Sequence, residues 1–355
     1  MYKRQDFLWD DVVGSARIDR PDTDNDTIQR ANVARGNGLQ CGDNRSGGDN
    51  GVIAKVRVCT VRLCAADGDY KVIGGGMEAS ANAPAGKRAT LFTFAKPSLG
   101  GSIAIVQGDP KTGSSQGVTA LTYFRGNSAK AAESWGEETG KVLSFLASNF
   151  GLAPNASIGL IETEDGAPNG YAAPGVLFLS PRAIGSQANP RLLVNQLSRQ
   201  WWGLQISPVS RNHLWITNGM ARYAELLWVE QSQGPGALEG EVRDTYVEAM
   251  TVDNPPLIQS ARFEDYSPEY WATTAGKGAA VYHMLRSVLG DDKFKEFLKI
   301  VPDKFAGRSV STENIKDVAS QLAGQDLGYF FIPVSYTHLR AHETKANLVC
   351  RLLLE

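Results

Sequence analysis

The sequence predicts an α+β protein, in which the end of an N-terminal antiparallel β domain precedes a mostly helical domain. Short β-like runs alternate with turn residues between residues 51 and 112, whereas helical three- and four-residue spacing dominates later. The composition is that of an ordinary globular chain, with 42% hydrophobic residues and a formal net charge of −2. No apolar run reaches the roughly eighteen residues that predict a membrane span.

Both ends of the chain depart from the patterns beside them. Residues 1–5 (MYKRQ) can be encoded GTG TAT AAG AGA CAG, and the reverse complement, preceded by C and read out of phase, encodes Pro-Val-Ser-Tyr-Thr, the sequence of residues 333–337. Residues 1–5 and 334–355 therefore resemble translated sequencing adapter on a metagenomic fragment, the alternative being a natural tail. Without them the net charge is −5, and the remaining histidines and cysteines are His213, His283, Cys41, Cys59 and Cys64.

These counts exclude several classes of protein. Three unevenly spaced cysteines make neither a disulfide framework nor a CxxC metal site. An acidic balance without a basic patch predicts no nucleic-acid partner. We expect a secreted, periplasmic or membrane-linked protein; the sequence predicts no oligomeric state.

The elements follow in order along the chain. Residues 6–50 are polar and rich in Asp, Asn and Gly, which predicts a loop or disordered region. Beyond a polar loop at 111–117 and one more strand, a helix with apolar residues from Trp135 onward ends near Gly151, and helices follow from Pro190. The predicted strands are 52–63, 70–76, 89–97, 101–109, 118–124, 156–164 and 175–181.

Residues 192–230 hold the most informative motif. Asn195-Gln196-Leu197-Ser198-Arg199 is followed by Gln-Trp-Trp-Gly, and Asn218 comes within LWITNGMARYAE. The segment resembles the core of the aminopeptidase N family of gluzincin zinc peptidases, in which H-E-x-x-H-x-W-x-G is followed by a ligand glutamate after eighteen further residues. The resemblance covers about residues 55–331 and implies a thermolysin-like domain at 113–333, truncated at its end.

The resemblance implies a zinc site whose chemical residues are replaced. Asn195, Arg199 and Asn218 stand at the three ligand positions, and Gln196 stands at the general base. Two neutral amides are poor ligands for Zn²⁺, and a guanidinium has no lone pair to donate. Gln196 cannot take a proton from water. We therefore expect no intact metal site and no cofactor, although the family would use Zn²⁺.

Two further family positions are replaced in the same way. The exopeptidase motif G-A-M-E-N corresponds to residues 169–173, where Ala172 stands in place of the glutamate that pairs with a substrate amine. The next residues, Gly175, Val176 and Leu177, are the expected substrate-binding strand, available for edge pairing with a peptide. Ala275 replaces the tyrosine of Y-E-K-G-A that would stabilise an oxyanion.

Other motifs have structural explanations. We expect His213 and His283 to be satisfied structural histidines, and Trp201 and Trp202 to pack in the core. GGMEA at 75–79 predicts a turn, and GSSQG at 113–117 is a polar loop that leads into a strand, unlike a nucleophile elbow.

Three functions remain open. The first is a non-catalytic homologue of aminopeptidase N-type peptidases that retains binding of peptides or unfolded protein segments. The second is an active metallo-aminopeptidase whose zinc is held by atypical ligands. The third is a structural domain of a larger secreted or membrane-linked protein.

Overall fold

The computed structural model describes residues 38–44, 56–66, 70–74, 77–82, 87–94, 103–115, 118–155, 157–167, 169–252 and 255–336. The predicted adapter at 1–5, residues 6–37 of the predicted polar loop and residues 337–355 lie outside this part. Contacts divide the chain into two units. The first runs to Pro110 and takes in Ala173–Val176, and the second holds the rest from Lys111.

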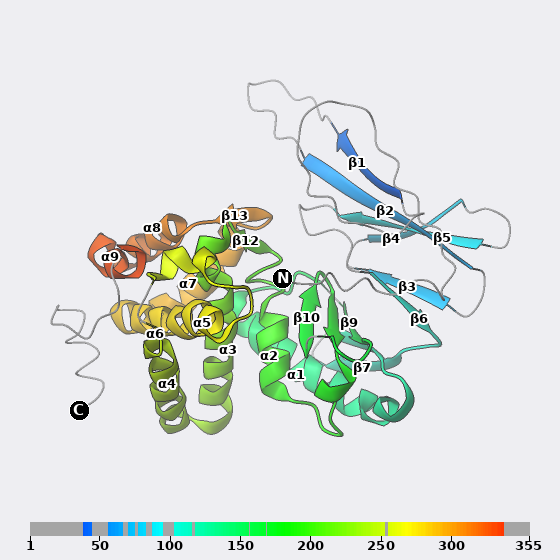
Figure 1. The fold of residues 1–355 in the computed structure, drawn as a ribbon, viewed down its shortest axis with the longest axis horizontal. Helices are drawn as coiled ribbons and strands as arrows, with labels where there is room; N and C mark the ends of the chain where they lie inside the picture. The colour runs from blue at the N-terminus through cyan, green and yellow to red at the C-terminus, as the bar shows by residue number, and fades with distance from the viewer. Residues whose placement is uncertain are drawn as a thin grey trace. The chain divides into compact units, whose positions relative to one another are not determined.

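The first unit is made of antiparallel strands (Figure 1). Its larger sheet has the order β1-β2-β5-β4, and β3 pairs with β6. Two predictions need correction. Gly38–Asn44 was expected in a loop but is a strand, because its backbone pairs along β2, and Met77–Ala79 lies in β4 instead of a turn. The strands are β1 (Gly38–Asn44), β2 (Val56–Ala66), β3 (Tyr70–Gly74), β4 (Met77–Ala81), β5 (Lys87–Phe94) and β6 (Ile103–Gln107).

The second unit begins with a five-stranded sheet of order β10-β11-β9-β8-β7. Strands β7 and β8 are antiparallel, whereas β8 and β9 are parallel. The predicted loop at 111–117 is wrong over Lys111–Ser115, which forms the edge strand β7 despite its polar sequence because an edge strand needs only one paired side. The strands are β7 (Lys111–Ser115), β8 (Val118–Tyr123), β9 (Ser157–Glu162), β10 (Gly170–Ala173), β11 (Val176–Leu179), β12 (Ile206–Pro208) and β13 (Arg308–Val310).

The helices of the second unit pack beside this sheet and on one another (Figure 1). Helix α1 contacts β7 and β8 and buries Trp135, Val142 and Leu146, as the spacing predicts. The helices are α1 (Ala132–Phe150), α2 (Pro190–Ser198), α3 (Trp215–Gln233), α4 (Pro235–Met250), α5 (Pro268–Trp271), α6 (Gly278–Leu289), α7 (Asp291–Lys304), α8 (Thr312–Ala323) and α9 (Gly328–Tyr336). The predicted α+β class is confirmed.

Helices α3 and α6 cross at two glycines. A Cβ atom on Gly219 would lie 2.6 Å from the Cα and carbonyl carbon of Gly278, and one on Gly278 would lie 2.8 Å from the Cα of Gly219. Both distances are shorter than ordinary carbon contacts, so side chains larger than hydrogen do not fit here. The close crossing brings Asn218, beside Gly219, against the residues that precede α6.

The core of the second unit is rich in aromatic side chains. Trp202 is fully buried and lies edge-on to Tyr282, with ring centroids 5.9 Å apart, while Tyr223 lies edge-on to Phe294 at 5.7 Å. The Tyr282 hydroxyl donates to the carbonyl of Ile216 at 2.9 Å, and burial raises its pKa well above the ordinary value. Among the described residues, no helix combines the length and apolarity that crossing a membrane requires.

Candidate functional site

Helix α2 carries the first part of the predicted zinc motif. Its start is defined by Asn189, whose side chain accepts from the Leu192 N–H, and by Pro190 in the first turn, where the missing N–H costs nothing. Asn195 and Gln196 lie on this helix, which ends at Ser198. Arg199 follows as the C-cap with φ −67° and ψ −15°, so positions 195 and 199 keep helical i, i+4 spacing.

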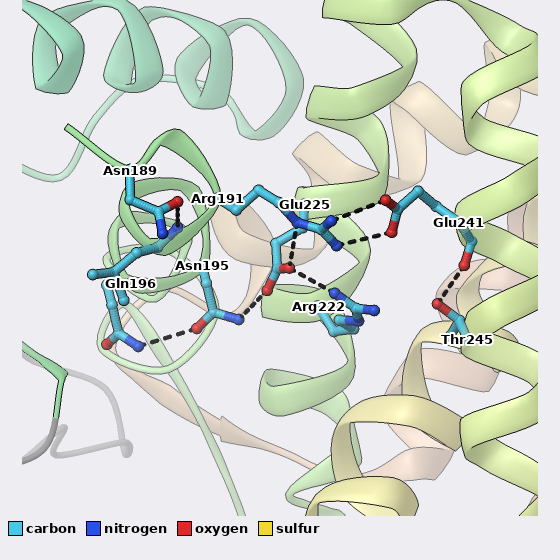
Figure 2. Close-up of polar contacts among 9 residues, drawn as sticks. Asn189, Arg191, Asn195, Gln196, Arg222, Glu225, Glu241 and Thr245 are labelled. Atoms are coloured by element: carbon cyan, nitrogen blue, oxygen red, sulfur yellow. Dashed lines mark hydrogen bonds and ion pairs between the residues drawn. The ribbon is translucent and has the colours of Figure 1, made fainter. Parts of the chain in front are cut away.

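A carboxylate on α3 organises the polar residues around Asn195 (Figure 2). Glu225 is 8% exposed, and its oxygens accept from Asn195 Nδ2 at 2.7 Å, Arg222 Nη1 at 2.7 Å and Arg191 Nε at 3.4 Å. Arg191 also donates two hydrogen bonds to Glu241, at 2.9 and 2.8 Å. The network links α2, α3 and α4 and compensates the buried charge of Glu225.

A second polar group surrounds Asn218, which is 4% exposed. Its Oδ1 accepts from Arg199 Nη1 at 2.9 Å, and its Nδ2 donates to the Tyr270 hydroxyl and to Thr274 Oγ1, both at 3.1 Å. Thr274 in turn donates to the Tyr270 carbonyl at 2.8 Å. Burial lowers the pKa of the Arg199 guanidinium, while Tyr270, Glu225 and Tyr266 act in the opposite sense.

The orientation of both amides follows from their partners. Glu225 can only accept, so the atom of Asn195 that faces it is Nδ2, and Asn195 Oδ1 then accepts from Gln196 Nε2 at 3.1 Å. Arg199 can only donate, so Asn218 presents Oδ1 to it. The two amide oxygens that could face a metal are therefore engaged by protein donors.

These residues do not fit a Zn²⁺ ion. Zinc sites use imidazole nitrogen, thiolate or carboxylate ligands, and here the three positions offer two hydrogen-bonded amides and a cation without a lone pair. Within the described residues, no group of three or more His, Cys, Asp or Glu side chains is arranged to hold a metal.

The predicted substrate-binding residues lie on and between β10 and β11, and β10 passes against α2. A Cβ atom on Gly170 would lie 2.8 Å from Cγ of Gln196, so β10 passes directly against the predicted general-base position. Ala172 on β10 is 8% exposed, and the side chains of Val176 and Leu177 on β11 are buried. Gly175, in the turn between the strands, has φ 69°, which favours glycine.

The prediction that the strand with Gly175, Val176 and Leu177 is available for edge pairing is wrong. Strand β11 lies between β10 and β9, so both of its backbone edges are used within the sheet. The edge strand on this side of the sheet is β10, Gly170–Ala173, which follows from the order of the strands and not from any local sequence pattern.

Ala275 lies in a π-helical segment, Ala272–Lys277, between α5 and α6. Such wide turns are rare and occur frequently at functional sites. Its methyl group supplies no hydroxyl, but Tyr270, five residues earlier, places one within 3.1 Å of Asn218. A tyrosine hydroxyl therefore does reach this group, from a position that the motif comparison did not single out.

The two histidines have structural roles, as predicted. His213 Nδ1 accepts the backbone N–H of Thr312 at 3.1 Å and lies 3.0 Å from the hydroxyl of the same residue, at the start of α8. His283 Nδ1 lies 3.4 Å from the Tyr223 hydroxyl. Burial lowers the pKa of both imidazoles.

The tryptophan pair also packs in the core, as predicted. Trp201 and Trp202 are at most 1% exposed, and both lie edge-on to Phe150. They follow the end of α2 and are not part of the helix itself.

Sequence reasoning missed Glu225 and Tyr270. Glu225 lies seven residues after Asn218, which is two helical turns on the same face of α3, and this spacing was the available signal. No sequence spacing pointed to Tyr270, because the π-helical turn between Tyr270 and Ala275 departs from regular α-helical spacing.

Comparisons with known proteins show what the second unit is similar to. Residues 182–333 match the peptidase family M1 domain. Human aminopeptidase N is 27% identical over 199 residues, covering 50% of this chain and 21% of that protein. Rice aminopeptidase M1-B is 23% identical over 167 residues, covering 42% and 19%. The chain thus spans about a fifth of the length of these curated relatives.

Solved structures show the same fold. The M1 zinc metallopeptidase from Deinococcus radiodurans has a TM-score of 0.64 at 21% identity, over 79% of this chain and 64% of that one. Native yeast LTA4 hydrolase has a TM-score of 0.61 at 16% identity, over 79% and 47%. Residues 182–333 thus match the peptidase family M1 domain and are similar to aminopeptidase N, and the chain has the fold of the M1 zinc metallopeptidases.

Proposed function

We propose that the chain is a non-catalytic homologue of the M1 aminopeptidases that binds peptides without cleaving them. The observation that carries the proposal is the 2.9 Å hydrogen bond between Arg199 and Asn218, which joins two predicted ligand positions to each other. A guanidinium keeps its proton and places a fixed positive charge where a dication would bind. Gln196, whose amide cannot act as a general base, supports the same conclusion.

The position of β10 beside α2 supports peptide binding. Strand β10 is the last strand of the five-stranded sheet on this side, and a Cβ atom on Gly170 would lie 2.8 Å from Cγ of Gln196. Holding an extended peptide takes backbone and side-chain contacts and needs no catalytic group. A peptide held beside Gly170 would therefore pass the residues that replace the zinc motif.

The first test is metal content and activity. We expect purified chain that has been incubated with Zn²⁺ and desalted to hold no stoichiometric zinc by mass spectrometry, and to release no amine from aminoacyl-nitroanilide substrates. One bound zinc per chain, or turnover that a chelator abolishes, would contradict the proposal.

The second test restores the predicted ligands. The quadruple variant Asn195→His, Gln196→Glu, Arg199→His and Asn218→Glu should gain zinc binding, whereas an active enzyme with atypical ligands would lose activity through the same changes. The matched control omits Arg199→His and should bind no zinc, because the guanidinium charge remains. Zinc binding by the control variant would show that the charge of Arg199 does not prevent zinc from binding.

The third test separates a peptide-binding site from a structural domain. A peptide-library screen should return ligands that compete with one another for a single site. A structural domain whose old site is filled would bind none.

A further inference from the structure

The two hydrogen-bonded groups around Asn195 and Asn218 together contain one more cation than anion. Arg191, Arg199 and Arg222 supply three positive charges, and Glu225 and Glu241 supply two negative ones. Arg191 is paired with Glu241 at 2.8 Å, and Arg222 is paired with Glu225 at 2.7 Å. The uncompensated charge is therefore that of Arg199.

Arg199 makes little use of its hydrogen-bonding capacity. A guanidinium has five N–H donors, and in the described part of the chain its one hydrogen-bond partner is the neutral amide of Asn218. No carboxylate of the described residues lies within ion-pair distance of it, and Glu225 acts on its pKa only at longer range. The side chain is partly buried, so water compensates its charge less well than at the surface.

Tyr270 supplies a second donor beside the same amide. Its hydroxyl oxygen accepts from Asn218 Nδ2, which leaves the hydroxyl proton available to a ligand. Its ring lies edge-on to Trp271, with centroids 5.1 Å apart, and this contact restricts its position. The side-chain amide of Asn218 is thus hydrogen-bonded to the Arg199 guanidinium through its oxygen and to the Tyr270 hydroxyl through its nitrogen.

We propose that Arg199 and Tyr270 form a carboxylate-binding site, in which the guanidinium binds both ligand oxygens and the Tyr270 hydroxyl donates a further hydrogen bond. The inference deepens the proposed peptide binding and rests on it: the ligand is a peptide with a free carboxylate, at its C-terminus or on an acidic side chain. The planar fork of arginine matches a carboxylate. One surplus positive charge matches a monoanion better than a dianionic phosphate.

The test is calorimetric titration with four acetylated alanine peptides. One has a free C-terminal carboxylate and its partner has a C-terminal amide; the other two are amidated and carry an internal Asp or Asn. Binding of the first over the second identifies the C-terminal carboxylate as the ligand group, and binding of the third over the fourth identifies the side chain. Either result supports the site, and equal binding of all four overturns it.

Protein variants locate the binding. Arg199→Gln should weaken the preferred peptide by about ten- to a hundredfold, which is the value of hydrogen bonds to a charged group. Arg199→Lys should recover only part of this loss because lysine lacks the fork, and Tyr270→Phe should cost about tenfold. The charge-matched control is Arg243→Gln, at an exposed arginine of α4, which should bind as the parent does.

Each failure has its own signature. Far-ultraviolet circular dichroism identifies variants that do not fold, and Tyr270→Phe, which leaves the Arg199 to Asn218 bond in place, then carries the test. Peptide binding that Arg199→Gln and Tyr270→Phe leave unchanged overturns the carboxylate site but not the proposed function. If no peptide binds but acetate binds and is lost in Arg199→Gln, the carboxylate site stands and the proposed function fails.

Discussion

The crossing of α3 and α6 makes Gly219→Ala a sharp test of the fold around the site. The added Cβ would lie 2.6 Å from two backbone atoms of Gly278, against about 3.5–4.0 Å for ordinary carbon contacts. The helices must therefore separate by about 1 Å at this point. No side-chain rotation can relieve the contact, because both opposing atoms belong to the backbone.

The cost of this change follows from two opposing effects. Overpacking costs typically about 1–3 kcal/mol, and a backbone contact lies toward the upper end of that range. Alanine recovers about 1 kcal/mol over glycine inside a helix. We expect a net loss of about 2 kcal/mol in the free energy of unfolding.

The matched control is Gly240→Ala on α4, where an added Cβ would meet nothing within 4 Å. It gains the helix propensity without the clash and should stabilise the chain by about 1 kcal/mol. The assay is urea unfolding followed by tryptophan fluorescence, since Trp202 and Trp215 are buried in this unit. If Gly219→Ala proves as stable as Gly240→Ala, the close crossing is not real and the placement of Asn218 loses its support.

Three further changes probe charge and pH. Glu225→Gln should lower the unfolding free energy by about 3 kcal/mol, because Arg191 and Arg222 lose the buried anion that they share. Glu239→Gln, at an exposed position of α4, should have no measurable effect. Asn195→Asp places a second carboxylate where the amide lies 2.7 Å from Glu225. The free energy of unfolding of this variant should rise as pH falls, because the carboxylate pair then takes up a proton. An equal loss of unfolding free energy at neutral and acidic pH would contradict this. Burial lowers the folded-state pKa of His213 below 6.5, so unfolding takes up a proton and the free energy of unfolding should fall as pH drops below about 6.5. His213→Gln should flatten this pH dependence in urea titrations. An unchanged slope would show that His213 is not the group that titrates.

Much of the fold follows from local pattern. The apolar spacing that starts at Trp135 predicted α1, and the glycine after it ends the helix at φ 92°. The motif around Asn195 and Asn218 predicted the two helices that carry it, since packing and spacing residues were kept where the chemical ones changed. The edge strands were missed because their local sequence does not indicate a strand. Lys111–Ser115 and Gly38–Asn44 have polar sequences, and their strand conformation depends on backbone pairing with a distant partner.

The sequence was sufficient to name the positions that correspond to the family motif, to predict that their metal chemistry is replaced, and to place them on two helices, because helical spacing is local. It did not show that Arg199 would bond to Asn218, that Glu225 would hold Asn195, or that Tyr270 would reach the same amide. Those contacts join residues 19 to 52 positions apart. They depend on how α2 packs on α3 and on the close approach of α3 and α6. Both are set by packing between elements, which no single stretch of sequence encodes.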